Sequence, residues 1–251
     1  MTDVHCDLRS RLPSAVVDLA LRLGADPVAN RTRVRLRQSG QMRQDAATAW
    51  MPFTARQTLA TDRCDFDWRA RSGPAGLIFV RDALDGGRGR FSVLGLGILP
   101  IVNVKPSFEL TRGQLMRYLA ELAWAPDAIL HNADLRWRDE GPDRLVVGAG
   151  SGQGAAEVTL NLDRDGRIDS AFAPDRGRMV AEAIVPTPWG GRFLDYRDHH
   201  GVWLPFGAEV SWSMPEGDVV YWKAGIDFWE KGEEGSSPSV RRNIAMREIR
   251  K

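Results

Sequence analysis

The chain has 251 residues, of which 43% are hydrophobic and 27% charged, a balance that is ordinary for a globular protein with a large core. Its formal net charge of +1 at pH 7 provides no general attraction to nucleic acid or to an anionic membrane. The sequence has no signal-peptide run near its start and no stretch of about 18 successive apolar residues, so we expect a cytoplasmic protein with no membrane span.

Residues 1–10 are expected to form a flexible tail, and the first predicted element follows it directly. A stripe of apolar residues recurs there at helical spacing, formed by Leu12, Val16, Leu19 and Leu23. Gly24 supplies a helix stop. We therefore expect an amphipathic helix over 13–23 that packs on a larger element as a lid.

From Thr32 onward the apolar pattern changes to alternation, which is typical of β-strands. The sequences DGG at 85–87 and DRDG at 163–166 indicate tight turns. Many strands joined by short turns predict an up-and-down antiparallel sheet. We expect strands at 32–40, 52–61, 64–72, 76–84, 88–98, 133–139, 143–149, 155–162, 167–173, 191–198, 202–213 and 218–228.

One segment interrupts the alternation. Thr111, followed three residues later by Gln114, has the form of a capping box, which predicts that a helix begins there. The sequence LMRYLAELAWAP that follows favours helix and is apolar nearly all round, so this helix should be buried on more than one side. Its only residues charged at neutral pH, Arg117 and Glu121, stand at the i, i+4 spacing that lets them pair. We expect a helix at about 112–125 inside the curve of the sheet.

The last segment, residues 231–251, is polar and rich in turn-forming residues. It offers little apolar surface to bury, so we expect it to be disordered or peripheral. The remaining 11–230 would form a single, mainly β domain.

Six segments carry a resemblance to a known family: LPSAVVDLALRLG, RVRLRQSGQMR, MPFTARQ, RDALDGGRG, LMRYLAELAWAPDAIL and RFLDYRDHHGVWLPFGAEVSW. In that order they resemble an uncharacterised bacterial domain family of unknown function, over residues 11–229. The DYRDHHGVWLP hairpin is also similar to a strand pair of lipoprotein carriers (LolA-like). That architecture includes a small cofactor-free enzyme of violacein biosynthesis (VioE-like). The resemblance implies a strongly curved antiparallel sheet, a half-barrel closed by helices over an apolar cavity, and it implies no agreed activity.

Aromatic residues gather on the late strands. Alternate residues from Val202 to Trp212 share one strand face, and those from Val220 to Phe228 share another. These faces either pack as ordinary core or line part of a ligand pocket. The candidate ligand contacts are Trp68, Arg81, Tyr118, Glu121, Trp124, Tyr196, Trp203 and Trp222.

Glu121 is the candidate catalytic residue, because the charge of a carboxylate on a buried helix must either be balanced by a partner or serve a function. It either pairs with Arg117 and fixes the helix, or it contacts a ligand and acts as a general base. Arg81 and Asp82 are adjacent on one strand and therefore point to opposite faces. The sequence leaves open which of them enters the cavity, and a cross-strand ion pair is the alternative role.

No metal or cofactor signature emerges. The most polar cluster, at 195–200, contains two adjacent histidines at a predicted turn, and their side chains would not converge on a metal. Cys6 and Cys64 have no partner at metal-ligand spacing. The glycine-rich 148–154 lacks the lysine and the serine or threonine of a phosphate loop. We expect no metal, no cofactor and no nucleic-acid partner.

Three functions stay open. The first is binding of a hydrophobic or amphipathic small molecule in an apolar cavity between the curved sheet and the helix at 112–125. The second is a cofactor-independent enzyme that carries out a proton transfer, cyclisation or rearrangement in the same cavity. The third is a structural or interaction module whose cavity is filled by its own side chains. The first two require that the helix occupy the hollow without filling it.

Overall fold

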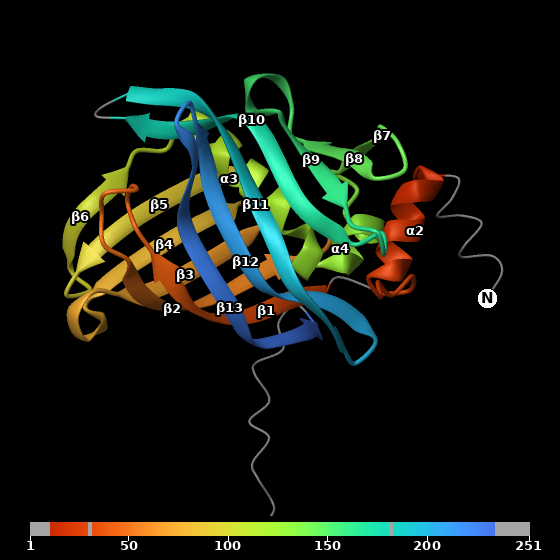
Figure 1. Cartoon of the computed structure of the whole chain (residues 1–251), viewed down its shortest axis with the longest axis horizontal. Coiled ribbons are helices and arrows are strands. Elements are labelled where there is room, and N and C mark those ends of the chain that lie inside the picture. The colour runs from red at the N-terminus through yellow and green to blue at the C-terminus, as the bar shows by residue number, and fades with distance from the viewer. Residues whose placement is uncertain (1–10, 30–31, 181–182, 234–251) are drawn as a thin grey trace, which may run out of the picture.

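The computed structural model describes residues 11–29, 32–180 and 183–233. Within them, thirteen strands form one antiparallel sheet in the order β6-β5-β4-β3-β2-β1-β13-β12-β11-β10-β9-β8-β7, which curls into a half-barrel (Figure 1). The strands are β1 Thr32–Met42, β2 Met51–Ala60, β3 Phe66–Ser72, β4 Ile78–Asp85, β5 Arg88–Gly95, β6 Leu99–Val104, β7 Arg136–Asp139, β8 Arg144–Ala149, β9 Ala156–Leu162, β10 Ile168–Val180, β11 Ala183–His199, β12 Val202–Met214 and β13 Gly217–Glu233. This is the predicted fold class.

The helices are few and short. They are α2 Ser14–Arg22, α3 Phe108–Ala120 and α4 Pro126–His131, with the 3₁₀ turns η1 Pro74–Gly76, η2 Glu121–Trp124 and η3 Gly152–Gly154. The sequence analysis did not predict α4, or β6 as a strand of its own.

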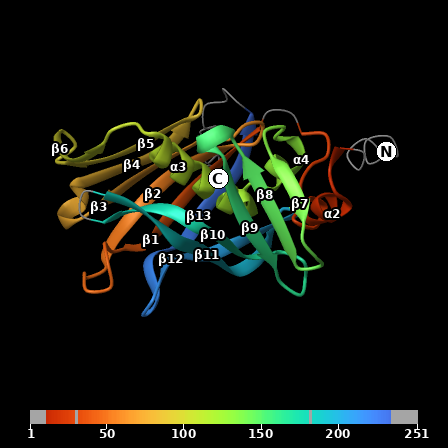
Figure 2. The ribbon, with the colours of Figure 1, turned by 90° about the horizontal axis from the view of Figure 1, so that it is seen from above.

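The order of the strands explains where α3 lies. The first and last strands, β1 and β13, pair at the middle of the sheet, so that one arm runs outward to the edge strand β6 and the other to the edge strand β7. In the chain, β6 is followed by α3, η2 and α4, and then by β7. The chain must therefore cross from one edge to the other, and α3 makes the crossing inside the curve (Figure 2).

The packing of α3 confirms that the internal helix lies in the concavity. It contacts β4 and β5 on one arm and β8, β9 and β10 on the other. Its residues Tyr118 and Leu119, and Leu122 just after it, are completely buried. A helix enclosed by both arms needs an apolar surface nearly all round, which is the pattern that predicted it.

The predicted start of this helix was wrong. The N-cap is Ser107, whose Oγ accepts a hydrogen bond from the Leu110 backbone N–H at 3.1 Å. Thr111 lies inside the helix, where its Oγ1 accepts a hydrogen bond from the Gly89 backbone N–H at 3.0 Å. The apparent capping box joins the helix to β5 instead.

Helix α2 confirms the amphipathic helix predicted at 13–23. Its apolar stripe is buried, and it packs on α4 and β7 at one end of the half-barrel. The chain then turns at Gly24, which has φ +83° and lies so close to the β11–β12 turn that an added Cβ would stand 2.1 Å from the Gly201 carbonyl oxygen. A residue without a Cβ is required at this contact.

The predicted C-terminal boundary of the domain, at residue 230, lies within strand β13 of the structure. Residues 231–233, assigned to the polar C-terminal tail, belong to β13 and pair with the start of β1. Lys231 also forms an ion pair with the buried Asp127, with Nζ and Oδ1 2.8 Å apart. The tails predicted at 1–10 and 234–251 lie outside the described residues.

Candidate functional site

A stripe of polar side chains runs along α3 on the concave side of the sheet. Gln114, Arg117 and Glu121 stand at i, i+3 and i+7, so they share one helical face. Arg117 donates from Nη1 to Asp82 Oδ2 at 2.6 Å and from Nε to Glu121 Oε1 at 2.8 Å. Burial opposes the charge of Arg117, but the two carboxylates raise its pKa. The helix is therefore fixed to β4 by a buried ionic group.

Strands β2 and β3 complete the surroundings of this group. The Gln57 amide donates to Glu121 Oε2, so both oxygens of the Glu121 carboxylate have protein partners. The Arg117 guanidinium lies over the rings of Phe66 and Trp68, 5.0 and 5.2 Å from their centroids. Trp68 in turn donates from its indole nitrogen to Gln38 Oε1 at 2.9 Å. The predicted Arg117–Glu121 pair is thus confirmed as part of a larger network.

A second arginine enters from the other arm of the sheet. Arg176, on β10, comes close to α3, since its Nε lies 3.9 Å from the position that a Cβ on Gly113 would take. Its guanidinium stacks over Trp189 at 4.3 Å from the ring centroid. Burial lowers the pKa of Arg176. The acidic groups Tyr221, Asp82 and Glu121 act to raise it but offset the effect of burial only in part. Two arginines, Arg117 and Arg176, thus stand against two carboxylates, so the group has no net charge.

Four buried polar atoms of this region have no hydrogen-bond partner among the described residues. They are Gln57 Oε1, Asp82 Oδ1, Gln114 Oε1 and Arg176 Nη1. As whole residues, Gln57, Asp82 and Gln114 are only 2%, 7% and 4% exposed. An unpartnered buried polar group costs about 1–3 kcal/mol, so native folds keep few of them. We call these four residues, with Arg117 and Glu121, the concave polar cluster.

Aromatic rings continue the concave face beside this cluster. Phe53 packs edge-on to Trp68 and stacks on Trp222, with centroids 5.6 and 5.8 Å apart. Trp189 donates from its indole nitrogen to the Tyr221 hydroxyl at 2.9 Å. Trp212, Tyr221 and Trp222 are half-buried, so they keep some contact with solvent. We call these rings the concave aromatic surface: Phe53, Trp68, Trp189, Trp212, Tyr221 and Trp222.

Of the eight predicted ligand contacts, three lie on the concave cluster or surface: Trp68, Glu121 and Trp222. Two others pack the hollow. Tyr118 is completely buried, where its hydroxyl donates to the Ala60 carbonyl at 2.9 Å and accepts from the Asn132 amide at 3.0 Å. Burial raises its pKa well above the ordinary value. Trp124 donates from its indole nitrogen to the Pro205 carbonyl at 2.9 Å. Around Tyr118 and Trp124, protein side chains fill the hollow of the sheet.

The other three predicted contacts lie elsewhere. Arg81 is on the convex face, where its Nη2 forms an ion pair with Asp67 Oδ2 at 2.9 Å, so the cross-strand pair is its observed role and Asp82 is the residue that enters the concavity. Tyr196 and Trp203 flank Arg167, whose guanidinium is 3.9 Å from the Trp203 ring centroid. The Tyr196 hydroxyl donates to the Ile168 carbonyl at 2.9 Å. None of the three contacts the concave polar cluster.

The described part of the chain has grooves that are open to solvent. One, of about 430 Å³, lies between the start of α3 and the β10–β11 hairpin, where an Arg112–Asp175 ion pair of 2.8 Å crosses it. Its lining is Phe108, Glu109, Arg112, Gln153, Asp175, Gly177, Ile184 and Pro186.

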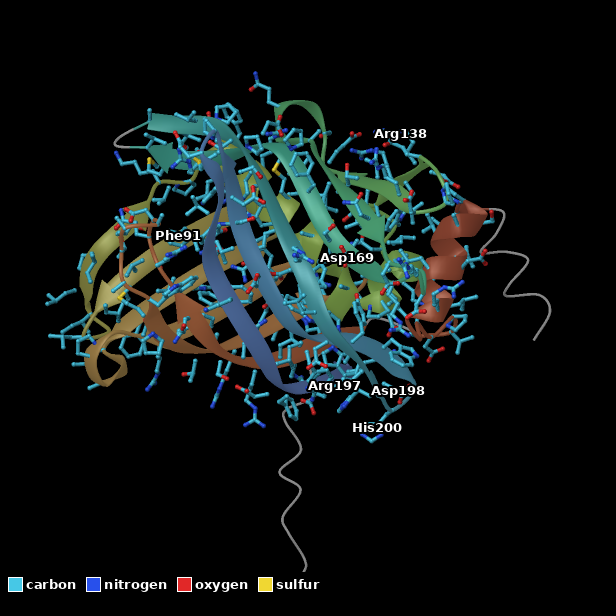
Figure 3. All side chains as sticks on the ribbon, viewed as in Figure 1. Phe91, Arg138, Asp169, Arg197, Asp198 and His200 are labelled. Atoms are coloured by element: carbon cyan, nitrogen blue, oxygen red, sulfur yellow. The ribbon has the colours of Figure 1, made fainter. Side chains whose placement is uncertain are left out.

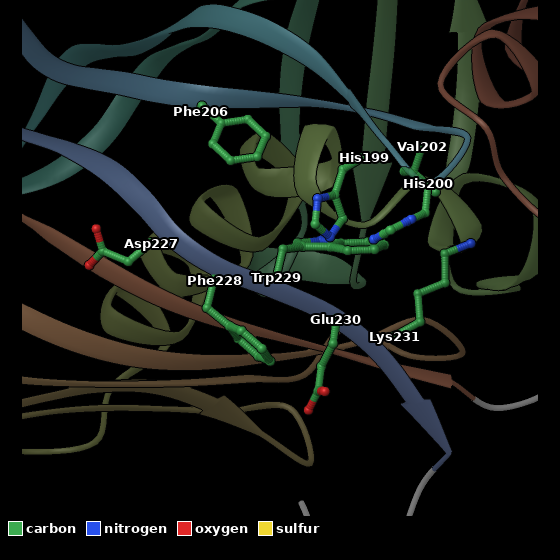
Figure 4. A pocket seen from close by; sticks show the side chains of 9 residues that line it. All are labelled: His199, His200, Val202, Phe206, Asp227, Phe228, Trp229, Glu230 and Lys231. Carbon is green, nitrogen blue, oxygen red and sulfur yellow. The ribbon is translucent and has the colours of Figure 1, made fainter. Parts of the chain in front are cut away.

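The second groove, of about 620 Å³, opens where β12 and β13 separate. Their pairing ends at Gly207 and Gly225. Figure 4 shows the Trp229 side chain beneath His199, between β13 and the β11–β12 turn. The Trp229 indole nitrogen is anchored to the Trp124 carbonyl at 2.9 Å. The predicted strand face ending at Phe228 is broken here, because a β-bulge at Asp227 turns Trp229 inward.

The polar cluster predicted at 195–200 belongs to this turn. Arg197, Asp198 and His200 lie at the outer end of the β11–β12 hairpin, exposed as expected for a solvated turn (Figure 3). Among the residues with described positions, no group of three or more His, Cys, Asp or Glu side chains is arranged to hold a metal ion. No helix in the same residues has the length and hydrophobicity needed to cross a bilayer.

Sequence reasoning missed half of the concave polar cluster. Gln114 was assigned to a helix cap, although a glutamine one turn before Arg117 on an apolar helix was a usable signal. Arg176 lies beyond the predicted end of its strand at 173, and Gln57 sits within a regular alternation. Nothing in the sequence paired either of them with α3.

The chain belongs to DUF6544, a family of unknown function, whose profile matches residues 3–224. A search of curated proteins finds no significant match. Among solved structures, the chain is similar to a LolA superfamily protein of Nitrosomonas europaea, at 12% identity and a TM-score of 0.45, over 86% of this chain and 91% of that one. It is also similar to a DUF1329 family protein of Desulfovibrio piger, at 12% identity and a TM-score of 0.46, over 89% and 94%. A third is a putative outer membrane lipoprotein-sorting protein domain of Vibrio parahaemolyticus, at 9% identity and a TM-score of 0.33, over 94% and 93%.

Proposed function

We propose that this member of a family without assigned function binds an amphipathic small molecule on the concave side of its sheet. The polar group of the ligand would meet the concave polar cluster on α3, and its apolar part would lie along the concave aromatic surface. The observation that carries the proposal is the set of four unpartnered buried polar atoms beside those rings.

The unpartnered atoms define the chemistry of the polar group. Three of them, on Gln57, Asp82 and Gln114, are acceptors, and the fourth, on Arg176, is a donor. Because two arginines and two carboxylates balance within the cluster, a full negative charge on the ligand would have no excess cation to meet it. A neutral or zwitterionic group that both donates and accepts hydrogen bonds fits this arrangement best.

The apolar part of the ligand has a defined surface to lie on. Trp212, Tyr221 and Trp222 are half-buried, and ligand sites in proteins are typically apolar and aromatic with a few convergent polar groups. The 430 Å³ groove lies between the start of α3 and β10, the two elements that carry Gln114 and Arg176.

The test uses Gln114, which can lose its unpartnered oxygen with little change of shape. In Gln114→Met the full chain should bind the neutral amphipathic probe N-phenyl-1-naphthylamine about ten-fold more weakly, because one hydrogen bond to a buried acceptor is lost. The same variant should also resist urea better than the wild type, since an unpartnered acceptor has been removed. Better folding with weaker binding separates a lost contact from a damaged fold.

The matched control is Gln41→Met, on β1, where the side chain is exposed. It should leave probe affinity unchanged. Equal affinity of the wild type and Gln114→Met, measured by fluorescence titration, would remove the concave polar cluster from the binding site.

A second candidate function, cofactor-independent proton transfer at the same site, is favoured by one observation. Glu121 has both oxygens engaged, whereas Asp82 has one oxygen without a partner. A general base on this face would thus be Asp82 in place of the predicted Glu121. If native mass spectrometry of the protein from its host identifies a ligand that is turned over, Asp82→Asn should abolish turnover and Glu121→Gln should spare more of it. Full turnover in Asp82→Asn would exclude this role.

A further inference from the structure

Two hairpins at one end of the half-barrel expose large aliphatic side chains to solvent. On the β5–β6 hairpin, Leu96, Ile98, Leu99 and Ile101 are between 56% and 77% exposed. On the β10–β11 hairpin, Met179 and Ile184 are 53% and 37% exposed. We call these six side chains the apolar rim. Contiguous exposed apolar surface on a folded protein marks an interaction site or a liability to aggregate.

The composition of the β5–β6 turn is unusual for a turn in water. Turns that face solvent are usually made of Gly, Asn, Asp, Ser and Pro, whereas this one reads Leu96-Gly97-Ile98. Leu96 holds a left-handed backbone, with φ +54°, which is costly for a branched side chain. Ile98 is the most exposed large apolar residue of the described chain. The turn therefore presents its apolar side chains outward at a cost in stability.

The two hairpins belong to opposite arms of the sheet, yet both point toward the same end of the molecule, away from α2 (Figures 1 and 2). Pairing of β6 with a second copy of the chain would cover only one of them. A flat, extended apolar medium would cover both at once.

Each half of the rim also has an arginine beside it. Arg71 stacks on Phe79, 5.0 Å from the ring centroid, and Phe79 lies directly under the turn at Gly97. Arg178 lies on β10, next to Met179. The two hairpins, at 92–104 and 176–187, contain a single acidic residue, Glu182, which lies outside the described residues. Aliphatic tips with guanidinium groups behind them match the hydrocarbon and phosphate levels of a lipid surface.

We propose that the apolar rim docks the protein on the surface of a phospholipid bilayer, with its six side chains inserted among the lipids and Arg71 and Arg178 at the level of the phosphates. Docking of this kind needs no membrane-spanning segment. It goes beyond ligand binding and does not depend on it. The groove beside Ile184 would then face the lipid surface.

The test is flotation of the full chain with vesicles of phosphatidylcholine and phosphatidylglycerol on a density gradient, with no other ligand present. The wild type should float with these vesicles and should float less with phosphatidylcholine alone. Ile98→Asp combined with Ile184→Asp should lower the bound fraction about ten-fold, because each hairpin loses an inserted side chain. The matched control is Val28→Asp, beyond α2 at the other end, where the valine is 73% exposed and should not contact lipid.

Several outcomes would overturn the proposal. They are failure of the wild type to float, equal flotation of the rim variant and the wild type, and equal loss in the Val28→Asp control. A doubled molar mass in solution that the rim variant returns to that of one chain, without vesicle binding, would assign the rim to a second copy and would also overturn it. Because flotation and probe binding are measured separately, either proposal can fail while the other stands.

Discussion

Removal of the Arg117 side chain tests the ionic group that holds α3 in the hollow. The side chains of Arg117, Asp82 and Glu121 are 14%, 10% and 12% exposed, and the two ion pairs measure 2.6 and 2.8 Å. In Arg117→Met two nearly buried carboxylates would lose their shared cation while the apolar stem is kept. Breaking a buried pair in this way typically costs about 3–5 kcal/mol.

The loss of the stacking on Phe66 and Trp68 adds about 1 kcal/mol, so we expect a total near 4–6 kcal/mol. For a domain of this size that corresponds to a fall in melting temperature of about 8–24 °C.

The discriminating control removes all three charges together. Asp82→Asn and Glu121→Gln, added to Arg117→Met, remove both uncompensated carboxylates and leave Arg176 as the one charged member of the concave polar cluster, so the triple variant should recover part of the lost stability. The assay is urea unfolding followed by circular dichroism. A loss below about 1 kcal/mol in Arg117→Met, or a triple variant as unstable as the single one, would refute the reasoning that these charges are coupled and buried.

Three other predictions concern single residues. Gly24→Ala should cost more than about 2 kcal/mol in urea unfolding, since its Cβ would meet backbone, whereas Gly87→Ala, which also has a positive φ but has no atom within 4 Å, should cost about 1 kcal/mol. Burial raises the pKa of the Cys64 thiol to about 12. In a Cys6→Ser background, Cys64 of the folded chain should therefore react with a thiol reagent at pH 8 about 1000-fold more slowly than Cys64 of the chain unfolded in urea. Rapid labelling of the folded chain would contradict this. At Asp67 burial acts to raise the pKa, but hydrogen bonds from two arginines lower it overall. The Asp67 carboxylate therefore stabilises the fold at pH 7, and this stabilisation is lost as the pH falls through the folded-state pKa. Asp67→Asn should cost up to about 1 kcal/mol in urea unfolding at neutral pH and nothing in strong acid.

The sequence predicted the elements whose patterns are local. Alternation identified the strands, and the apolar circumference of the segment around Tyr118 placed its helix inside the sheet. Local pattern also suggested a capping box at Thr111, which was wrong because that hydroxyl meets a strand instead of the first turn of its own helix. The Arg117–Glu121 pair was readable because both members lie on one helix.

The partners that complete the site were not readable. Gln57 and Asp82 come from one arm of the sheet and Arg176 from the other, far from α3 in sequence, so their meeting depends on how the arms close. The bulge at Asp227, which reverses the faces of the last strand, has no local signature either. Arg81 and Asp82 are adjacent on β4 and face opposite sides of the sheet, and nothing in the sequence shows which side is concave. Arg81 was therefore predicted as a ligand contact, although Asp82 is the residue that faces inward.

The topology gives a reason for the unpartnered atoms. Since the sheet ends in two separate edges, the chain has to cross the hollow. A version of α3 without its polar stripe would be wholly apolar on this face and would make the crossing at less cost in free energy. Gln114, Arg117 and Glu121 instead place polar groups in a nearly buried position, and both arms contribute side chains that satisfy them only in part. A fold that kept this arrangement for stability alone would gain by replacing Gln114 with an apolar residue of the same shape. The ligand proposed above would bind these groups, and the half-buried rings of Trp212 and Trp222 beside them would hold its apolar part.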